Sequence, residues 1–126
     1  MSSINRPYLV DMSTYQHQYL SASPVMQRDD RGLETETQRR SREGLPVWKV
    51  RLLETDLTTK VVDVQEVTIA VSALPSLAKL TTVTLVRPSV RAWAMPTANG
   101  GVRSGVTLSA DGLEPAAAPD IEEIEL

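Results

Sequence analysis

The chain has 126 residues, no cysteine, and a net charge of −3 from 13 basic and 16 acidic side chains. This length allows a single domain, and the lack of cysteine excludes thiolate zinc sites and thiol catalysis, so we expect no metal and no cofactor. The charge is uneven: Asp111 to Leu126 contain six acids and no base, which leaves +3 on residues 1–110. No apolar run reaches the ~18 residues of a membrane span, and the start lacks the apolar stretch of a signal peptide. We therefore expect a cytoplasmic protein that does not contact a membrane.

The chain divides into three segments of different composition. Residues 1–16 are polar and without a sustained period, and they indicate an N-terminal arm. Residues 111–126 form an acidic tail that begins with a Pro/Ala spacer. The middle segment, 17–110, is rich in Val, Thr, Leu and Ile and predicts strands. Five strands are expected there: His17 to Gln27, Leu45 to Glu54, Lys60 to Val71, Leu80 to Met95 and Val102 to Ala110.

Two signals in the second half of this segment refine the prediction. Pro88 lies inside the long fourth strand, which should therefore be bent, bulged or at a sheet edge. Asn99-Gly100-Gly101 predicts a hairpin before the last strand. Five strands in a domain of this size favour an all-β fold, a small five-stranded antiparallel barrel of the OB type; a small β-sandwich is the alternative.

Catalysis is poorly supported by the residues present. The sole histidine, His17, has no cysteine companion and reads as a structural residue. No glycine-rich turn opens a helix with a following Lys-Ser/Thr, so a phosphate loop is not expected. The clustered acids lie in the tail, where no scaffold would hold them at catalytic separation. We expect a protein that is not an enzyme.

The basic residues indicate a different activity. An OB barrel binds its ligand between its first and last hairpin loops, and bases at both loops would form a positive groove for a nucleic-acid backbone. Phosphate contacts are therefore expected from Arg39, Arg40, Arg42, Lys49, Arg51, Arg87, Arg91 and Arg103.

The two tryptophans are assigned different roles. Trp93 shares strand parity with Arg87 and Arg91, and an exposed indole beside arginines suits stacking of unpaired bases. Trp93 is thus the candidate stacking platform, with a core position as the alternative. Trp48 alternates in phase with Val50 and Leu52, which favours the core.

The acidic tail could serve a partner. Ile121, Ile124 and Leu126 are apolar residues set among acids, a pattern that would dock into a basic pocket of a replication or repair protein. The alternatives are a segment that competes with DNA for the protein's own arginines, and a solubilising end.

Several short motifs carry a resemblance over about residues 17–113. Glu43-Gly44-Leu45-Pro46-Val47-Trp48-Lys49-Val50, a valine-rich strand, Trp93 and Arg103-Ser104-Gly105-Val106 resemble a family of small proteins of conjugative plasmids, integrative elements and phages. Members are labelled regulatory or replication-associated and are similar to OB-fold single-stranded DNA-binding modules. The tail is similar in kind to the acidic tails of bacterial and phage single-strand binding proteins, although it ends in Ile124-Glu125-Leu126 rather than Pro-Phe.

These observations favour a non-enzymatic protein of a mobile element or phage that binds single-stranded DNA, with RNA as an alternative ligand. A homo-oligomer is compatible with the sequence. The competing hypothesis is a structural β-barrel, such as a virion decoration or accessory subunit, that assembles through its terminal segments. A double-strand regulator lacks a recognition helix, and only a β-ribbon reader remains open.

Overall fold

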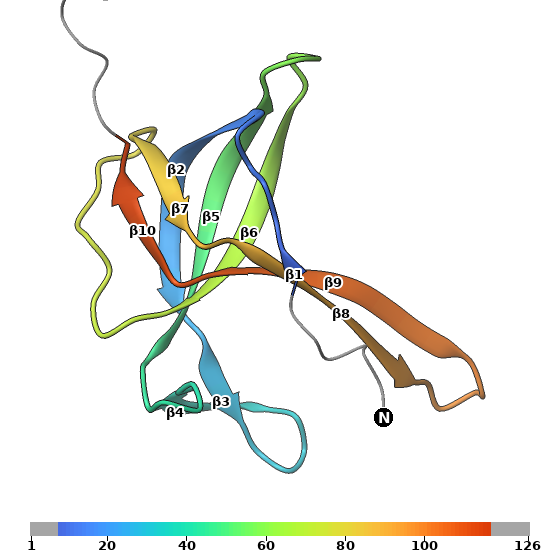
Figure 1. Cartoon of the computed structure of the whole chain (residues 1–126). Coiled ribbons are helices and arrows are strands. Elements are labelled where there is room, and N and C mark those ends of the chain that lie inside the picture. Colours follow the sequence, from blue (N-terminus) through green and yellow to red (C-terminus); the bar gives the residue numbers. More distant parts are fainter. Residues whose placement is uncertain (1–7, 117–126) are drawn as a thin grey trace, which may run out of the picture.

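The computed structural model describes residues 8–116, and within this range every regular element is a strand (Figure 1). No helix that could cross a membrane occurs in the described part of the chain. The ten strands are β1 (Tyr8–Leu9), β2 (Tyr15–Pro24), β3 (Met26–Arg28), β4 (Glu34–Gln38), β5 (Val47–Asp56), β6 (Val62–Ala70), β7 (Thr82–Val86), β8 (Ser89–Pro96), β9 (Val102–Ala110) and β10 (Gly112–Pro115).

Eight strands form one curled sheet in the order β1-β8-β9-β6-β5-β2-β7-β10, and β3 with β4 forms a second, small sheet. All pairs are antiparallel except β6 and β9, which run parallel where Thr68 pairs with Ser109 and Ile69 with Ala110. Only Asp111 separates β9 from β10, and β10 pairs with β7. From β7, the pairings run through β2, β5 and β6 to β9, and the chain then continues from β9 into β10, which pairs with β7. This circuit gives the sheet a barrel-like shape.

A bent two-stranded ribbon makes this shape possible. One side of the ribbon is β7 followed by β8, and the other side is β9 followed by β10. β7 and β8 are separated by Arg87 and Pro88, and the partner strands β9 and β10 are separated by Asp111 at the same level. Pro88 has no N–H to donate to the ladder, and Arg87 has a φ of 48°, so both residues interrupt the strand. One half of the ribbon, β7 with β10, lies in the barrel-like body, and the other half, the β8–β9 hairpin, projects from it (Figure 1).

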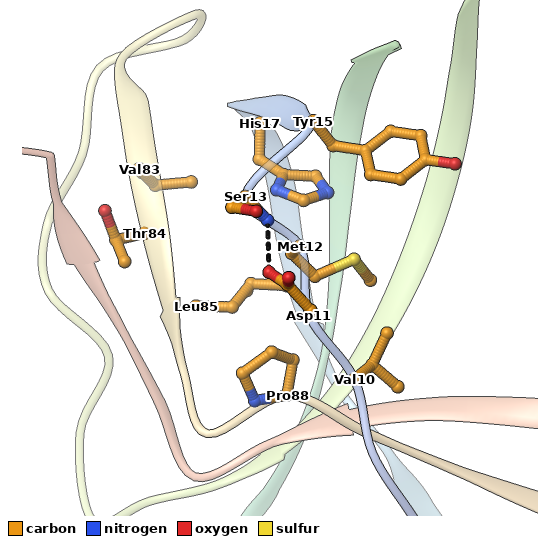
Figure 2. Close-up of a pocket in the computed structure, with 10 residues that line it drawn as sticks. All are labelled: Val10, Asp11, Met12, Ser13, Tyr15, His17, Val83, Thr84, Leu85 and Pro88. Carbon is orange, nitrogen blue, oxygen red and sulfur yellow. Dashed lines mark hydrogen bonds between the residues drawn. The ribbon is translucent and has the colours of Figure 1, made fainter. Parts of the chain in front are cut away.

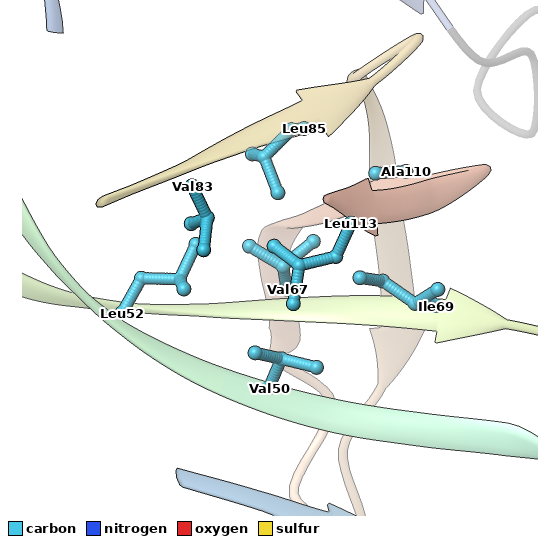
Figure 3. Close-up of a cluster of buried hydrophobic side chains, with 8 residues drawn as sticks. All are labelled: Val50, Leu52, Val67, Ile69, Val83, Leu85, Ala110 and Leu113. Atoms are coloured by element: carbon cyan, nitrogen blue, oxygen red, sulfur yellow. The ribbon is translucent and has the colours of Figure 1, made fainter. Parts of the chain in front are cut away.

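The core fills the interior of the curled sheet (Figure 3). Val50, Leu52, Val67 and Ile69 on β5 and β6 are fully buried. They pack with Val83, Leu85, Ala110 and Leu113, which come from both strands of the bent ribbon. Burial of a Val, Leu or Ile side chain contributes about 1.5–3 kcal/mol, so these contacts hold the ribbon against the β5–β6 sheet.

The structure confirms the all-β class but not the five-stranded antiparallel barrel, since it has ten strands in two sheets and one parallel pair. The last predicted strand, Val102–Ala110, is found as β9, and the bend expected at Pro88 divides the fourth predicted strand into β7 and β8. The first predicted strand begins earlier, at Tyr15, and is interrupted at Val25. The strands β1, β4 and β10 were not predicted.

The strand β10 shifts the point at which the tail begins. Residues 112–115 were assigned to the tail, yet they pair with β7, and Leu113 is 6% exposed in the core. A backbone hydrogen bond from Ala116 to Thr82 extends this pairing. A chain cut at Ala110 would therefore lose part of the core together with the acids.

We predict that Leu113→Ala lowers the free energy of unfolding by about 2–5 kcal/mol, because it leaves a cavity beside Leu85 and Val67. Chemical denaturation followed by circular dichroism measures the change. Leu33→Ala is the matched control, since Leu33 is 60% exposed and its loss should cost about 0.5 kcal/mol or less. Equal costs for the two variants would show that β10 is not part of the core.

Candidate nucleic-acid interface

Two hollows adjoin where β6 meets β9, and both are lined by Thr68. The first contains Arg39, Arg42 and Arg91, and the second contains Lys49, Trp93 and Arg103. We call these two hollows together the groove. Their volumes, about 770 and 640 Å³, exceed that of the hollow beside His17, about 350 Å³. Six of the nine residues predicted to bind nucleic acid thus line one continuous surface.

One wall of the groove is the outer face of β5 and β6. Val50 pairs with Val67 on the inner face, so their neighbours Lys49 and Thr68, which also pair, point outward. Glu66 shares this outer face, and it lies in the groove with Lys49. The alternation that buries the core therefore presents Lys49 to the groove.

The other wall is one face of the β8–β9 hairpin. The pairs Arg91 with Thr107, Trp93 with Gly105, and Met95 with Arg103 place these side chains together, and we call this the front face of the hairpin. The turn at 97–101 sets this register, and Gly100 adopts the positive φ that the turn requires. β6 and β9 touch only near Thr68 and Ser109, and the groove lies where they diverge.

The indole of Trp93 lies directly on Gly105. A Cβ atom at position 105 would be 2.7 Å from Cζ2 of Trp93 and 2.9 Å from Cε2, closer than real carbon contacts allow. Trp93 is half-buried as a result, because the ribbon covers one side of the ring. Gly105 thereby fixes where the aromatic surface lies beside the groove.

The loop between β4 and β5 supplies the remaining bases. Arg39 is held at the main chain, where its N–H donates to Val25 and its carbonyl accepts from Val47. The loop then turns tightly, as Nη1 of Arg40 donates to the Gly44 carbonyl at 2.8 Å and Ser41 donates to Leu45. This turn presents Arg42 to the groove beside Arg39.

The groove is positively charged. It contains five bases and two acids, Glu43 and Glu66, a formal balance of +3. The Nζ atom of Lys49 lies 4.0 Å from Oε1 of Glu66, and both side chains are about half exposed. A pair this open is screened by water and holds Lys49 only weakly, so Lys49 remains able to contact another anion.

The other three predicted bases line neither hollow of the groove. Arg40 is engaged by the Gly44 carbonyl, and Arg51 is exposed on β5 without lining either hollow. Arg87 lies at the ribbon bend, 3.4 Å from the carboxylate of Asp111, and lines a separate hollow with Leu9 and Ser89. The tail residues Ile121, Ile124 and Leu126 lie outside the described residues.

The two aromatic assignments have different outcomes. Trp93 borders the groove but is half-buried, so its role as an exposed stacking platform stays a prediction. Trp48 is half-buried at the end of the core rather than inside it, and its Nε1 donates to the Val71 carbonyl at 3.3 Å. Trp48 is therefore a structural residue that ties β5 to the end of β6.

His17 lines the hollow between β2, β7 and the N-terminal segment (Figure 2). It is 4% exposed, and its Nε2 lies 2.8 Å from the carboxylate of Glu54. The carboxylate of Asp11 accepts from the backbone N–H of Ser13, which lowers the pKa of Asp11. The buried ring of His17 is therefore held by the carboxylate of Glu54.

Residues 8–116 contain no group of three or more His, Asp or Glu side chains placed to hold a metal ion. No protein-family model matches the chain, and no curated protein matches it.

Sequence reasoning missed several residues of the groove. Gly105 was detectable, because a hairpin turn at 97–101 already places it opposite Trp93. Glu66 was not predicted, although it shares strand parity with Thr68 on β6. Thr68 and Ser109 carried no signal, since their pairing joins strands that are distant in the sequence.

We predict that Gly105→Ala displaces the indole of Trp93, because the added methyl would overlap the ring. In a Trp48→Phe background, the emission of Trp93 should shift to the red and acrylamide should quench it more strongly. Gly112→Ala is the control, since its Cβ would meet Val86 at an ordinary 3.6 Å. Unchanged quenching in Gly105→Ala would contradict the close contact.

Proposed function

We propose that this chain is a non-enzymatic protein that binds single-stranded nucleic acid in the groove. The observation that carries the proposal is the convergence of five bases and Trp93 on two adjoining hollows from three separate parts of the chain. Cations along a groove contact successive phosphates, and an aromatic side chain beside them stacks an unpaired base. DNA is the first candidate ligand, with RNA as the alternative.

The order of the strand pairings also supports this proposal, because it suits a fold that binds oligonucleotides. We propose that the barrel-like sheet is a variant of the OB-fold. β2, β5 and β6 would be its first three strands, and β7–β8 and β9–β10 its bent fourth and fifth strands. The groove then lies on the outer face of the second and third strands, between the first and last loops, where OB-folds bind oligonucleotides.

Single strands suit the groove better than a duplex. The structure has no helix among its described residues to enter a major groove. Trp93 offers a π-surface, which only an unpaired base can reach. A role in the replication, recombination or regulation of a mobile element or phage rests on the sequence resemblance alone, and a replication or repair partner for the tail rests on its composition.

We predict that the full chain binds fluorescently labelled oligo-dT at low salt and that Trp93→Ala weakens this binding about 5- to 150-fold, the equivalent of about 1–3 kcal/mol for one stacked base. Arg103→Ala should reduce the slope of log affinity against log salt by about 0.7, since one phosphate contact is lost. Fluorescence anisotropy at several salt concentrations measures both effects.

Arg87→Ala is the matched control for this experiment, because Arg87 is an exposed arginine of the same ribbon that lies outside the groove. It should change neither affinity nor slope measurably. The proposal fails if the full chain does not bind oligo-dT at tens of micromolar protein, or if Arg87→Ala and Arg103→Ala have equal effects.

We further predict that Glu66→Gln strengthens binding up to about fivefold at low salt. Its carboxylate lies 4.0 Å from Nζ of Lys49 and competes with phosphate for that cation. The gain should disappear as salt screens the groove. Glu114→Gln on β10 makes the same charge change outside the groove, and an equal gain in both variants would show that net charge alone matters.

A further inference from the structure

The turn that joins β8 to β9 holds the one Asn-Gly step of the chain. Thr97 is half-buried, and the residues after it, 98–101, are exposed at the end of the projecting hairpin (Figure 1). The hydroxyl Oγ1 of Thr97 donates to Oδ1 of Asn99 at 2.7 Å. The N–H of Gly100 donates to the Thr97 carbonyl at 3.2 Å. Thr97 therefore contacts both the side-chain amide of Asn99 and the main-chain nitrogen that follows it.

These groups are the reactants of asparagine deamidation. In this reaction the nitrogen of the residue after an asparagine attacks the side-chain amide carbon Cγ, and glycine leaves that nitrogen least hindered because it has no Cβ. A donor on Oδ1 polarises the amide and stabilises the negative charge that the attack places on this oxygen. We propose that Asn99 is a self-modification site, at which the Gly100 nitrogen attacks with the help of the Thr97 hydroxyl and Asn99 becomes aspartate or isoaspartate.

The turn has to open before the Gly100 nitrogen can reach Cγ, because its N–H points at the Thr97 carbonyl. That hydrogen bond is at the long end of the range for N–H···O contacts. The turn is also closed by a hydrogen bond from the N–H of Thr97 to the Gly101 carbonyl. It lies away from the core at the far end of the hairpin (Figure 1), so its opening disturbs little packing and costs little free energy.

The reaction consumes water and releases ammonia. Hydroxide takes the proton of the Gly100 N–H, and the nitrogen lone pair forms a bond to Cγ of Asn99 while the carbonyl pair moves onto Oδ1. The oxyanion re-forms the carbonyl, the Cγ–Nδ2 bond breaks, and Nδ2 takes a proton from water and leaves as ammonia, which regenerates hydroxide. Water then opens the cyclic imide. Cleavage of the bond between the nitrogen and Cγ gives aspartate, and cleavage of its bond to the main-chain carbon gives isoaspartate.

The two products affect the hairpin differently. Both replace a neutral amide with a carboxylate at the tip of the hairpin. Isoaspartate also routes the main chain through the side-chain carbon, which adds one carbon to the turn. Because this turn sets the register that places Trp93 on Gly105, isoaspartate displaces the indole. The turn therefore acts as a timer that alters the front face of the hairpin as the chain ages.

Peptide mapping by mass spectrometry during incubation of the full chain tests the site without nucleic acid, so the result does not depend on the groove. Asn99 should convert with first-order kinetics, at a rate that rises in proportion to hydroxide concentration. Asn5 is the internal control, since the side chain of Arg6 hinders the nitrogen that follows it, and it should convert much more slowly. Conversion of Asn99 no faster than that of Asn5 would overturn the proposal.

Thr97→Val tests the role of the hydroxyl. It should slow the conversion of Asn99 about 2- to 12-fold, the effect expected of one hydrogen bond. Thr84→Val is the matched control, because it makes the same change at an exposed position of β7, and it should leave the rate unchanged. In urea, where the chain is unfolded, the original chain and Thr97→Val should convert at equal rates. An unchanged or faster rate in folded Thr97→Val would overturn the assistance by Thr97.

The displacement of the indole is measured in the Trp48→Phe background. Acrylamide should quench Trp93 more strongly as isoaspartate accumulates. Asn99→Asp carries the charge of the other product on a normal main chain, so its quenching should match that of the fresh chain. Asn99→Gln incubated in the same way should stay unchanged. Equal quenching before and after conversion would overturn the proposed effect on the hairpin.

Discussion

The bend in the ribbon at Arg87, Pro88 and Asp111 is the constraint on which the rest of the structure depends. Proline cannot donate to the ladder, and the left-handed φ of Arg87 turns the strand, so β7 and β8 run in different directions. The backbone N–H of Asp111 donates to Val86, and that of Val10 to Pro88, so hydrogen bonds hold the main chain at the bend. The Arg87–Asp111 ion pair is exposed and adds little.

The bend separates two parts of the ribbon, one that completes the core and one that borders the groove. Below it, Val83, Leu85 and Leu113 enter the core and fix β7 and β10 to the body. Beyond it, the base of the β8–β9 hairpin still meets the core through Leu108 and Ala110, while its outer part is largely exposed. The parallel contact between Thr68 and Ser109 lies just before the bend, and it determines how β9 leaves β6. The position of the groove therefore follows from the same few residues that complete the barrel-like sheet.

An element could be predicted from the sequence where the residues that define it lie close together in the chain. β9 was predicted in full, because Gly100 and Gly101 mark its start and its alternation is regular. β10 was missed because four residues give little periodicity and the surrounding acids suggested a tail. The parallel pairing of β6 with β9, and the break between β9 and β10 that matches the expected bend at Pro88, involve contacts between distant segments, which periodicity does not reveal. The bases of the groove were predicted as part of a larger set, but Arg40, Arg51 and Arg87 could not be separated from the other five bases without the fold.

The two faces of the hairpin are coupled by strand geometry. Successive residues of β8 point to opposite sides, so Trp93 and Arg91 can face the groove only if Ala92 and Ala94 face away from it. A one-residue slip in either strand would move that strand's side chains to the other face and separate Trp93 from Gly105. The turn at 97–101 prevents such a slip, with Thr97 donating to Gly101 and Gly100 donating back to Thr97. This turn therefore maintains the charged, aromatic surface and the apolar surface of Ala92 and Ala94 together, and a change in its length would alter both.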